Sequence, residues 1–175
     1  MKSNIALIGF MGTGKTVVGQ ILAKKLKLKF IETDTMIEEK AYKSIPQIFT
    51  DMGEIGFREL EIEVTREIAQ KRYSVIACGG GLVLNRINID RLRQGAVIVN
   101  LTATPQATLT RISNQAGQRP LLDVTDPIST IRDMLQFRKP FYERAADITI
   151  NTSRLTPESV ADEIIRKLKE NESRN

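Results

Sequence analysis

The segment from Gly9 to Thr16 has the residue types and the spacing of a loop that binds phosphate groups. It reads Gly-Phe-Met-Gly-Thr-Gly-Lys-Thr, which fits the pattern G-x-x-x-x-G-K-[ST]. Glycines let the backbone curl so that successive N–H groups face one phosphate, while Lys15 can reach the β- and γ-phosphate oxygens. The Thr16 hydroxyl can then bind Mg²⁺. The pattern predicts a site for a nucleoside triphosphate with one magnesium ion.

The elements on either side of this loop are those that a phosphate-binding loop requires. Residues 4–9 form a short apolar run that ends in glycine, as expected of a strand buried in a parallel sheet. Residues 15–26 carry apolar side chains at helical spacing. Because the loop joins a predicted strand to a predicted helix, we prefer this interpretation to a chance glycine-rich turn.

Two carboxylates follow the second predicted strand, residues 29–31. Asp34 lies at the carboxyl edge of the sheet, where open α/β folds bind ligands, and is a candidate to face the phosphoryl acceptor. The alternative is that Asp34 caps a helix that begins near Thr35. Glu32 points the same way along an extended segment and could hold a water on the metal without touching the ion.

Arginines and glycines form the next candidate features. Arg58 and Glu61 are three residues apart on a helix predicted over residues 54–71, so the carboxylate can hold the guanidinium. Taken alone, these two residues favour a solvated surface pair. Three glycines, residues 79–81, directly follow a predicted strand over residues 73–78. Each glycine costs conformational entropy on folding and has no side chain to pack. Close approach of a ligand would explain why glycines stand here.

The rest of the chain alternates between strand and helix patterns, which predicts a three-layer α/β sandwich with a five-stranded, mainly parallel sheet. A length of 175 residues fits one domain, residues 1–175. We expect a polar lid over residues 114–126 and a frayed tail from about residue 170. The remaining expected elements are helices at 34–41, 105–113, 128–144 and 157–169, a further short helix capped by Ser44, and strands at 96–101 and 147–150.

Composition excludes several classes of function. The chain has no histidine and one cysteine, Cys78, so it has no internal disulfide, no Cys/His zinc set and no imidazole-based hydrolase site. A net charge of +5 suits an anionic partner, but 5% aromatic residues leave little material for stacking single-stranded nucleic acid. A GTPase is disfavoured because no N-K-x-D motif occurs. No apolar run approaches the roughly 20 residues needed to span a bilayer, and no signal peptide is evident, so we expect a cytoplasmic protein.

In this order the motifs resemble those of the shikimate kinases, small P-loop kinases of the aromatic amino acid pathway. The resemblance covers nearly the whole chain. It implies a P-loop NTPase fold similar to that of nucleoside monophosphate kinases. It also implies ATP-dependent phosphorylation of the 3-hydroxyl of shikimate, which yields shikimate 3-phosphate and ADP on the route to chorismate. The motifs that carry it are residues 9–16, Asp34, Gly53-Glu54-x-x-Phe57-Arg58-x-x-Glu61, residues 79–81, Arg119-Pro-Leu-Leu and Arg138-x-x-x-Tyr142.

The resemblance also implies site residues. The catalytic set would be Lys15, Asp34 and Arg119, the last carried on the mobile lid. Shikimate would be held by Asp34, Arg58, Gly79, Gly80, Gly81 and Arg138, with Glu61 in support. ATP would be bound by Gly12, Thr13, Gly14, Lys15, Thr16, Val17, Arg111, Arg119, Arg154 and Pro157, and Mg²⁺ by Thr16 and, through water, Glu32. Many members of the family have Asp at the position of Glu32 and Arg at the position of Leu155. The neighbouring Arg154 is the residue considered as a substitute for that arginine.

Two alternatives stay open at this stage. One is another small-molecule P-loop kinase, with a gluconate- or nucleotide-type acceptor; the pocket's few aromatic residues argue against a nucleotide. The other is a non-catalytic nucleotide-binding regulatory module, which the presence of both Lys15 and Asp34 disfavours. We expect ATP and shikimate as the partners of a monomer, with no nucleic acid and no membrane.

Overall fold

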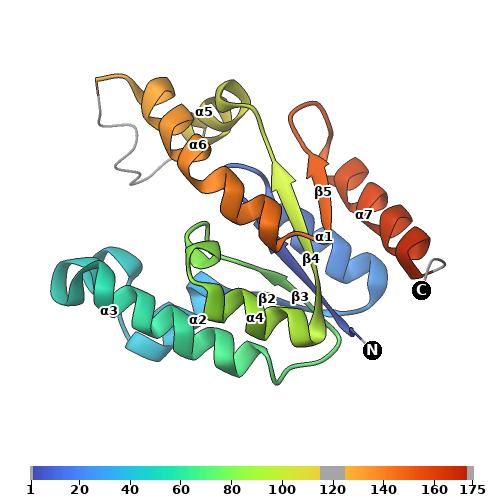
Figure 1. Ribbon diagram of the computed structural model, residues 1–175, viewed down its shortest axis with the longest axis horizontal. Helices are drawn as coiled ribbons and strands as arrows, with labels where there is room; N and C mark the ends of the chain where they lie inside the picture. The colour runs from blue at the N-terminus through green and yellow to red at the C-terminus, as the bar shows by residue number, and fades with distance from the viewer. Residues whose placement is uncertain (1, 115–124, 173–175) are drawn as a thin grey trace.

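A parallel β-sheet of five strands forms the centre of the molecule, with helices on both faces (Figure 1). The computed structural model describes residues 2–114 and 125–172. The strand order is β2-β3-β1-β4-β5, so β1 is the central strand. The three-layer sandwich and the parallel sheet predicted from the sequence are confirmed. The strands are β1 (Asn4–Ile8), β2 (Lys29–Glu32), β3 (Ser74–Ala77), β4 (Ala96–Thr102) and β5 (Ile148–Asn151).

Alternate residues of the strands enter two separate hydrophobic cores, as the period of two in a strand requires. Ala6 and Ile8 pack on one face with residues of α2, α3, α4 and α6, while Ile5 and Leu7 pack on the other with α1 and α7. The helices are α1 (Lys15–Leu26), α2 (Thr33–Ala41), α3 (Ile45–Ile68), α4 (Arg86–Gly95), α5 (Pro105–Ser113), α6 (Pro127–Ala145) and α7 (Pro157–Glu172).

The helix α3 departs from the sequence-based expectation. The two helices expected on either side of Gly53 form one span, Ile45–Ile68, and the second part ends three residues earlier than predicted. Gly53 itself is non-helical, with φ of 67° and ψ of −174°, a conformation open essentially to glycine alone. Ser44 precedes the span, and its N–H donates to the Gln47 side chain at 3.0 Å. The chain therefore changes direction at Gly53 without leaving the helical layer.

Two other expectations need correction. Helix α4 and the short 3₁₀ turn before it, Leu82–Leu84, were not predicted. At the other end, α7 continues to Glu172, so the frayed tail expected from about residue 170 is wrong for residues 170–172. Among the described residues, no helix is long and apolar enough to cross a membrane.

Candidate active site

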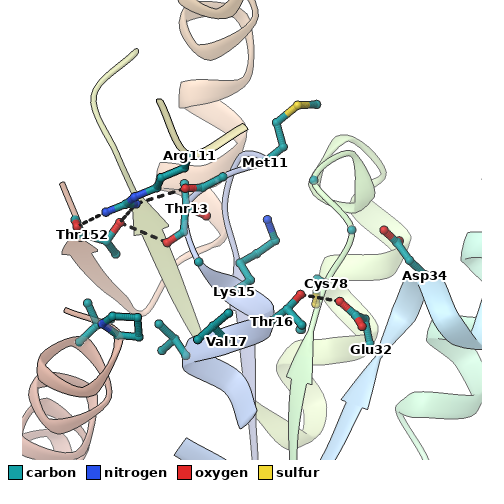
Figure 2. Close-up of a pocket in the computed structure, with 18 of the residues that line it drawn as sticks. Met11, Thr13, Lys15, Thr16, Val17, Glu32, Asp34, Cys78, Arg111 and Thr152 are labelled. Atoms are coloured by element: carbon teal, nitrogen blue, oxygen red, sulfur yellow. Dashed lines mark hydrogen bonds between the residues drawn. The ribbon is translucent and has the colours of Figure 1, made fainter. Parts of the chain in front are cut away.

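A cavity of about 830 Å³ opens at the carboxyl edge of the sheet, where β1, β2 and β3 end. Open α/β sheets bind ligands at this edge, next to the point where successive connections reverse direction. Figure 2 shows Lys15 and Thr16 beside Glu32, Asp34 and Cys78, with Arg111 and Thr152 across the loop from these carboxylates. The lining comes from residues 11–18, Glu32, Asp34, residues 77–81, Arg111, Asn114, Arg138, Thr152, Leu155, Pro157 and Val160.

The loop between β1 and α1 has the backbone that its glycines predict. Gly9, Gly12 and Gly14 all have positive φ, and a Cβ on Gly9 would lie 2.2 Å from the carbonyl oxygen of Leu101. Thr13 is buried, and its hydroxyl donates to the carbonyl of Phe10 at 2.8 Å. The loop thus leads into the N-terminus of α1, whose first turn contains no acidic residue. Such an N-terminus attracts an anion.

Lys15 is folded over this loop. Its Nζ donates to the carbonyls of Gly9 at 2.8 Å and Phe10 at 2.9 Å. The ammonium group therefore lies over the concave side of the loop, within reach of a phosphate that enters it. That Lys15 binds the β- and γ-phosphate oxygens stays a prediction.

Thr16 and Glu32 meet at one edge of the cavity. The Thr16 hydroxyl donates to Oε1 of Glu32 at 2.5 Å, although the residues are sixteen positions apart. An oxygen pair of this kind fits Mg²⁺, which takes one or two protein ligands and fills its other positions with water and phosphate. The described residues contain no group of three or more His, Cys, Asp or Glu that could hold a metal. A metal here would thus depend on the nucleotide for further ligands.

Asp34 is half-buried and lines the cavity. Helix α2 begins at Thr33 with Glu32 at its N-cap, so the expectation that Asp34 could be the cap is wrong. Its Oδ1 is buried and has no hydrogen-bond partner in the described part of the chain. Burial raises the pKa of Asp34, and the nearby Lys15 ammonium opposes this shift. The Asp34 side chain lines the cavity, where its carboxylate can accept a hydrogen bond from a ligand.

Arg58 and Glu61 form an ion pair in which Glu61 is buried and Arg58 half-buried, so the surface-pair interpretation is wrong. The Glu61 side chain is only 1% exposed, and Nη1 of Arg58 lies 3.2 and 3.1 Å from its two oxygens. Burial raises the pKa of Glu61 to about 7, against the opposing effect of Arg58. Nη2 of Arg58 donates to Glu54 at 3.3 Å. Two carboxylates therefore hold the guanidinium, which lies against Gly81 at the margin of the cavity.

The three glycines after β3 make room for the site's own side chains. A Cβ on Gly79 would lie 2.6 Å from Oδ1 of Asp34, and a Cβ on Gly81 would lie 2.5 Å from both Nη atoms of Arg58. A Cβ on Gly80 would have only ordinary contacts, at 3.6 Å or more. The expectation that a ligand approaches all three glycines therefore needs correction: at two of them the neighbour is Asp34 or Arg58.

Two side chains that were given no role in the predicted site fix this glycine turn. The Thr33 hydroxyl accepts the N–H of Gly79 at 2.8 Å, and the Tyr142 hydroxyl donates to the carbonyl of Gly80 at 2.6 Å. Burial raises the pKa of Tyr142 to about 12, so the phenol keeps the proton that it donates. The position of Thr33 next to Asp34 was the only signal in the sequence for its role.

Arg138 reaches the cavity from α6, one turn before Tyr142. Its guanidinium lies over the Phe10 ring, 5.6 Å from the ring centroid, and it lines the cavity beside Gly80. The structure thus brings Asp34, Arg138 and the glycine turn to one end of the cavity, with Arg58 at its margin. A cation held over an aromatic face keeps its N–H edges free for an anion.

The opposite end of the cavity is lined by Val17, Arg111, Leu155 and Pro157. Val17 is 49% exposed and lines this cavity. Arg154 is exposed and does not line the cavity, so the structure does not bring it to the predicted ATP site. Arg119 and most of the predicted lid, residues 115–124, lie outside the described residues.

Comparisons with known proteins agree with the motifs. The family model described as "Shikimate kinase" matches residues 11–169. The shikimate kinase of Thermodesulfovibrio yellowstonii is 46% identical over 94% of this chain and 94% of its own, and that of Caldanaerobacter subterraneus is 48% identical over 93% and 94%.

Solved structures show the same similarity. A shikimate kinase from Acinetobacter baumannii in complex with shikimate superposes with a TM-score of 0.90 and 36% identity, over 98% of this chain and 95% of its own. The shikimate kinase from Aquifex aeolicus gives a TM-score of 0.83 at 33% identity, over 96% and 97%. A sugar kinase from Janibacter, 18% identical with a TM-score of 0.65, shares the fold.

Proposed function

This chain belongs to the shikimate kinase family, and on that premise we propose that it transfers the γ-phosphoryl group of ATP to the 3-hydroxyl of shikimate. The products are shikimate 3-phosphate and ADP. The observation that carries the proposal is the Asp34 side chain, which lines the same cavity as the phosphate-binding loop. Its carboxylate can accept a hydrogen bond from a hydroxyl of the acceptor.

The acceptor end of the cavity suits a small hydroxylated carboxylate. Arg58 and Arg138 can each offer a planar pair of N–H groups to a carboxylate, a geometry that lysine does not reproduce. Asp34 would then accept a hydrogen bond from the attacking hydroxyl. Because phosphoryl transfer passes through a loose transition state in most analyses, Asp34 needs to orient this hydroxyl more than to remove its proton early.

The phosphate end of the cavity suits ATP. An entering phosphate oxygen would replace the carbonyls of Gly9 and Phe10 as acceptors for Lys15, and the loop N–H groups would bind the same phosphates. Thr16 and Glu32 would hold Mg²⁺, the first directly and the second through water. When bound, the ion neutralises charge on the phosphate oxygens. Arg111 and Pro157 would lie near the adenine.

Three further points belong to this proposal. Arg119 would reach the phosphates from a lid over residues 114–126. The enzyme would act as a monomer without nucleic acid or membrane partners. We place it in the cytoplasm because its co-substrate, ATP, is made and used there.

The test is an acceptor panel. The protein is incubated with Mg-ATP and, separately, shikimate, quinate, gluconate and AMP, and ADP release is measured. We expect release with shikimate and none when Lys15→Met replaces the wild-type protein. Release with gluconate or AMP but not with shikimate would overturn the proposed substrate, and no release with any acceptor would overturn the proposed reaction.

A further inference from the structure

Thr152, the residue directly after β5, links three segments that are far apart in the chain. It is 2% exposed, and its N–H donates to the carbonyl of Thr102 at 2.8 Å. Its own carbonyl accepts from Nη2 of Arg111 at 2.6 Å, and its hydroxyl oxygen accepts from Nη1 at 2.9 Å. The hydroxyl also lies 3.1 Å from the carbonyl oxygens of Thr13 and Thr102. Every polar group of Thr152 therefore forms a hydrogen bond.

The hydroxyl proton has two nearby acceptors and can satisfy only one well. The carbonyl of Thr102 already accepts a hydrogen bond from the Thr152 N–H. A hydrogen bond from the hydroxyl to the carbonyl of Thr13 therefore adds more stabilisation than a second one to Thr102. Arg111 supports the neighbouring peptide group, because Nη1 donates to the carbonyl of Gly12 at 3.2 Å. Two consecutive carbonyls of the phosphate-binding loop are thus held by Thr152 and its partner Arg111.

Holding these carbonyls sets the direction of the loop N–H groups. In a planar trans peptide the C=O and the N–H point in opposite directions. The Gly12 carbonyl shares its peptide with the N–H of Thr13, and the Thr13 carbonyl shares its peptide with the N–H of Gly14. Both N–H groups therefore point away from Arg111 and Thr152. In Figure 2 these two residues lie across the loop from Glu32 and Asp34.

We infer that Thr152 is a positioning residue for nucleotide binding, which turns the N–H groups of Thr13 and Gly14 toward the phosphates through its hydroxyl and through Arg111. The inference rests on the proposed function, because it requires that the loop binds ATP. It assigns Thr152 no contact with either substrate.

The experiment replaces the hydroxyl by a methyl group of similar size. In Thr152→Val we expect the dissociation constant for ADP, measured by calorimetry, and the KM for ATP both to rise roughly tenfold, as the loss of about one well-placed hydrogen bond implies. The KM for shikimate should not change. Thr152→Ser keeps the hydroxyl and should restore ADP binding to near the wild-type value.

Thr108→Val is the matched control. Thr108 is as buried as Thr152 and lies beside Gly12, but its hydroxyl has no partner in the described part of the chain. The same hydroxyl-to-methyl change should leave ADP binding unaltered there. If Thr152→Val does not fold, Thr152→Ala, which requires no extra space, is measured in the same way.

The outcomes are distinct. An unchanged ADP dissociation constant in Thr152→Val, or in Thr152→Ala where it replaces Thr152→Val, would overturn the inference. An equal rise in the KM values of both substrates would also overturn it, because that indicates general loosening of the site. A failure of Thr152→Ser to restore binding would also overturn it. If the wild-type protein binds no ADP at all, the proposed function fails and this inference fails with it.

Discussion

The buried Glu61 carboxyl should make the stability of the protein fall between about pH 4.5 and pH 7. Burial raises its pKa from the ordinary 4.5 to about 7, so in this range the folded state binds a proton that the unfolded state has released. Stability from this group is fully present below 4.5 and is lost as the pH rises through 7. At about 1.36 kcal/mol for each pH unit of difference, the loss is about 3 kcal/mol.

The variant Glu61→Gln isolates this contribution because its amide does not titrate. Urea unfolding of wild type and variant at several pH values from about 4.5 to about 8 gives the free energy of unfolding of each. We expect the wild type to lose about 3 kcal/mol relative to the variant across this range. The raised pKa of Asp34 and the lowered pKa values of Glu67 and Glu163 act in both proteins, so they largely cancel in the comparison.

The control is Glu63→Gln, two positions along the same helix. The Glu63 side chain is 49% exposed and pairs with Lys40 at the surface, so its removal should leave the pH dependence parallel to that of the wild type. If Glu61→Gln also runs parallel to the wild type, the Glu61 carboxyl does not carry a raised pKa. That result would refute the argument from burial.

Three further predictions concern the acceptor site. Gly79→Ala should lower kcat by about 100-fold, because a Cβ 2.6 Å from Oδ1 of Asp34 must displace this oxygen by about 0.8 Å to reach an ordinary contact; Gly95→Ala, at the opposite edge of the sheet, is the control for steady-state assays. Asp34→Asn should bind ADP normally in calorimetry but lose most turnover, and normal turnover would mean that the carboxylate charge is not needed. Arg58→Lys and Arg138→Lys should each weaken shikimate binding by about 1.5–3 kcal/mol in titrations, because lysine offers no planar pair of donors; unchanged affinity in both would contradict the proposed carboxylate site.

The helices whose bounds the sequence predicted best are those with a local signal where they begin. Helices α1 and α5 have the predicted bounds, because a glycine-rich loop precedes one and Thr104 with Pro105 begins the other. Helix α4 was missed because only a few of its residues are apolar and packed, although Asn85 caps it by accepting the N–H of Ile87 at 3.0 Å.

The sequence predicted correctly the proximity of those site residues that lie at the ends of parallel strands. Lys15 follows β1, Glu32 ends β2 and Asp34 follows it, and parallel strands bring such residues to one edge. The burial of the Arg58–Glu61 pair could not be predicted in this way. A spacing of three residues shows that Arg58 and Glu61 can pair, but it does not show that the pair lies beneath the Gly81 turn, which depends on packing between α3 and the end of β3. Thr152 was missed for the same reason, since its partners are distant in sequence.

The central place of β1 in the sheet has a consequence for synthesis on the ribosome. β1 is made first, but its two edges pair with residues 75–77 of β3 and 96–100 of β4, so neither edge is covered while the loop after it emerges. The Gly12 and Thr13 carbonyls of that loop gain their hydrogen-bond donors later still, when Arg111 and then Thr152 are synthesised. A ligand stabilises only the state that binds it. ATP can therefore stabilise the finished enzyme, but it gives no such help to the nascent chain.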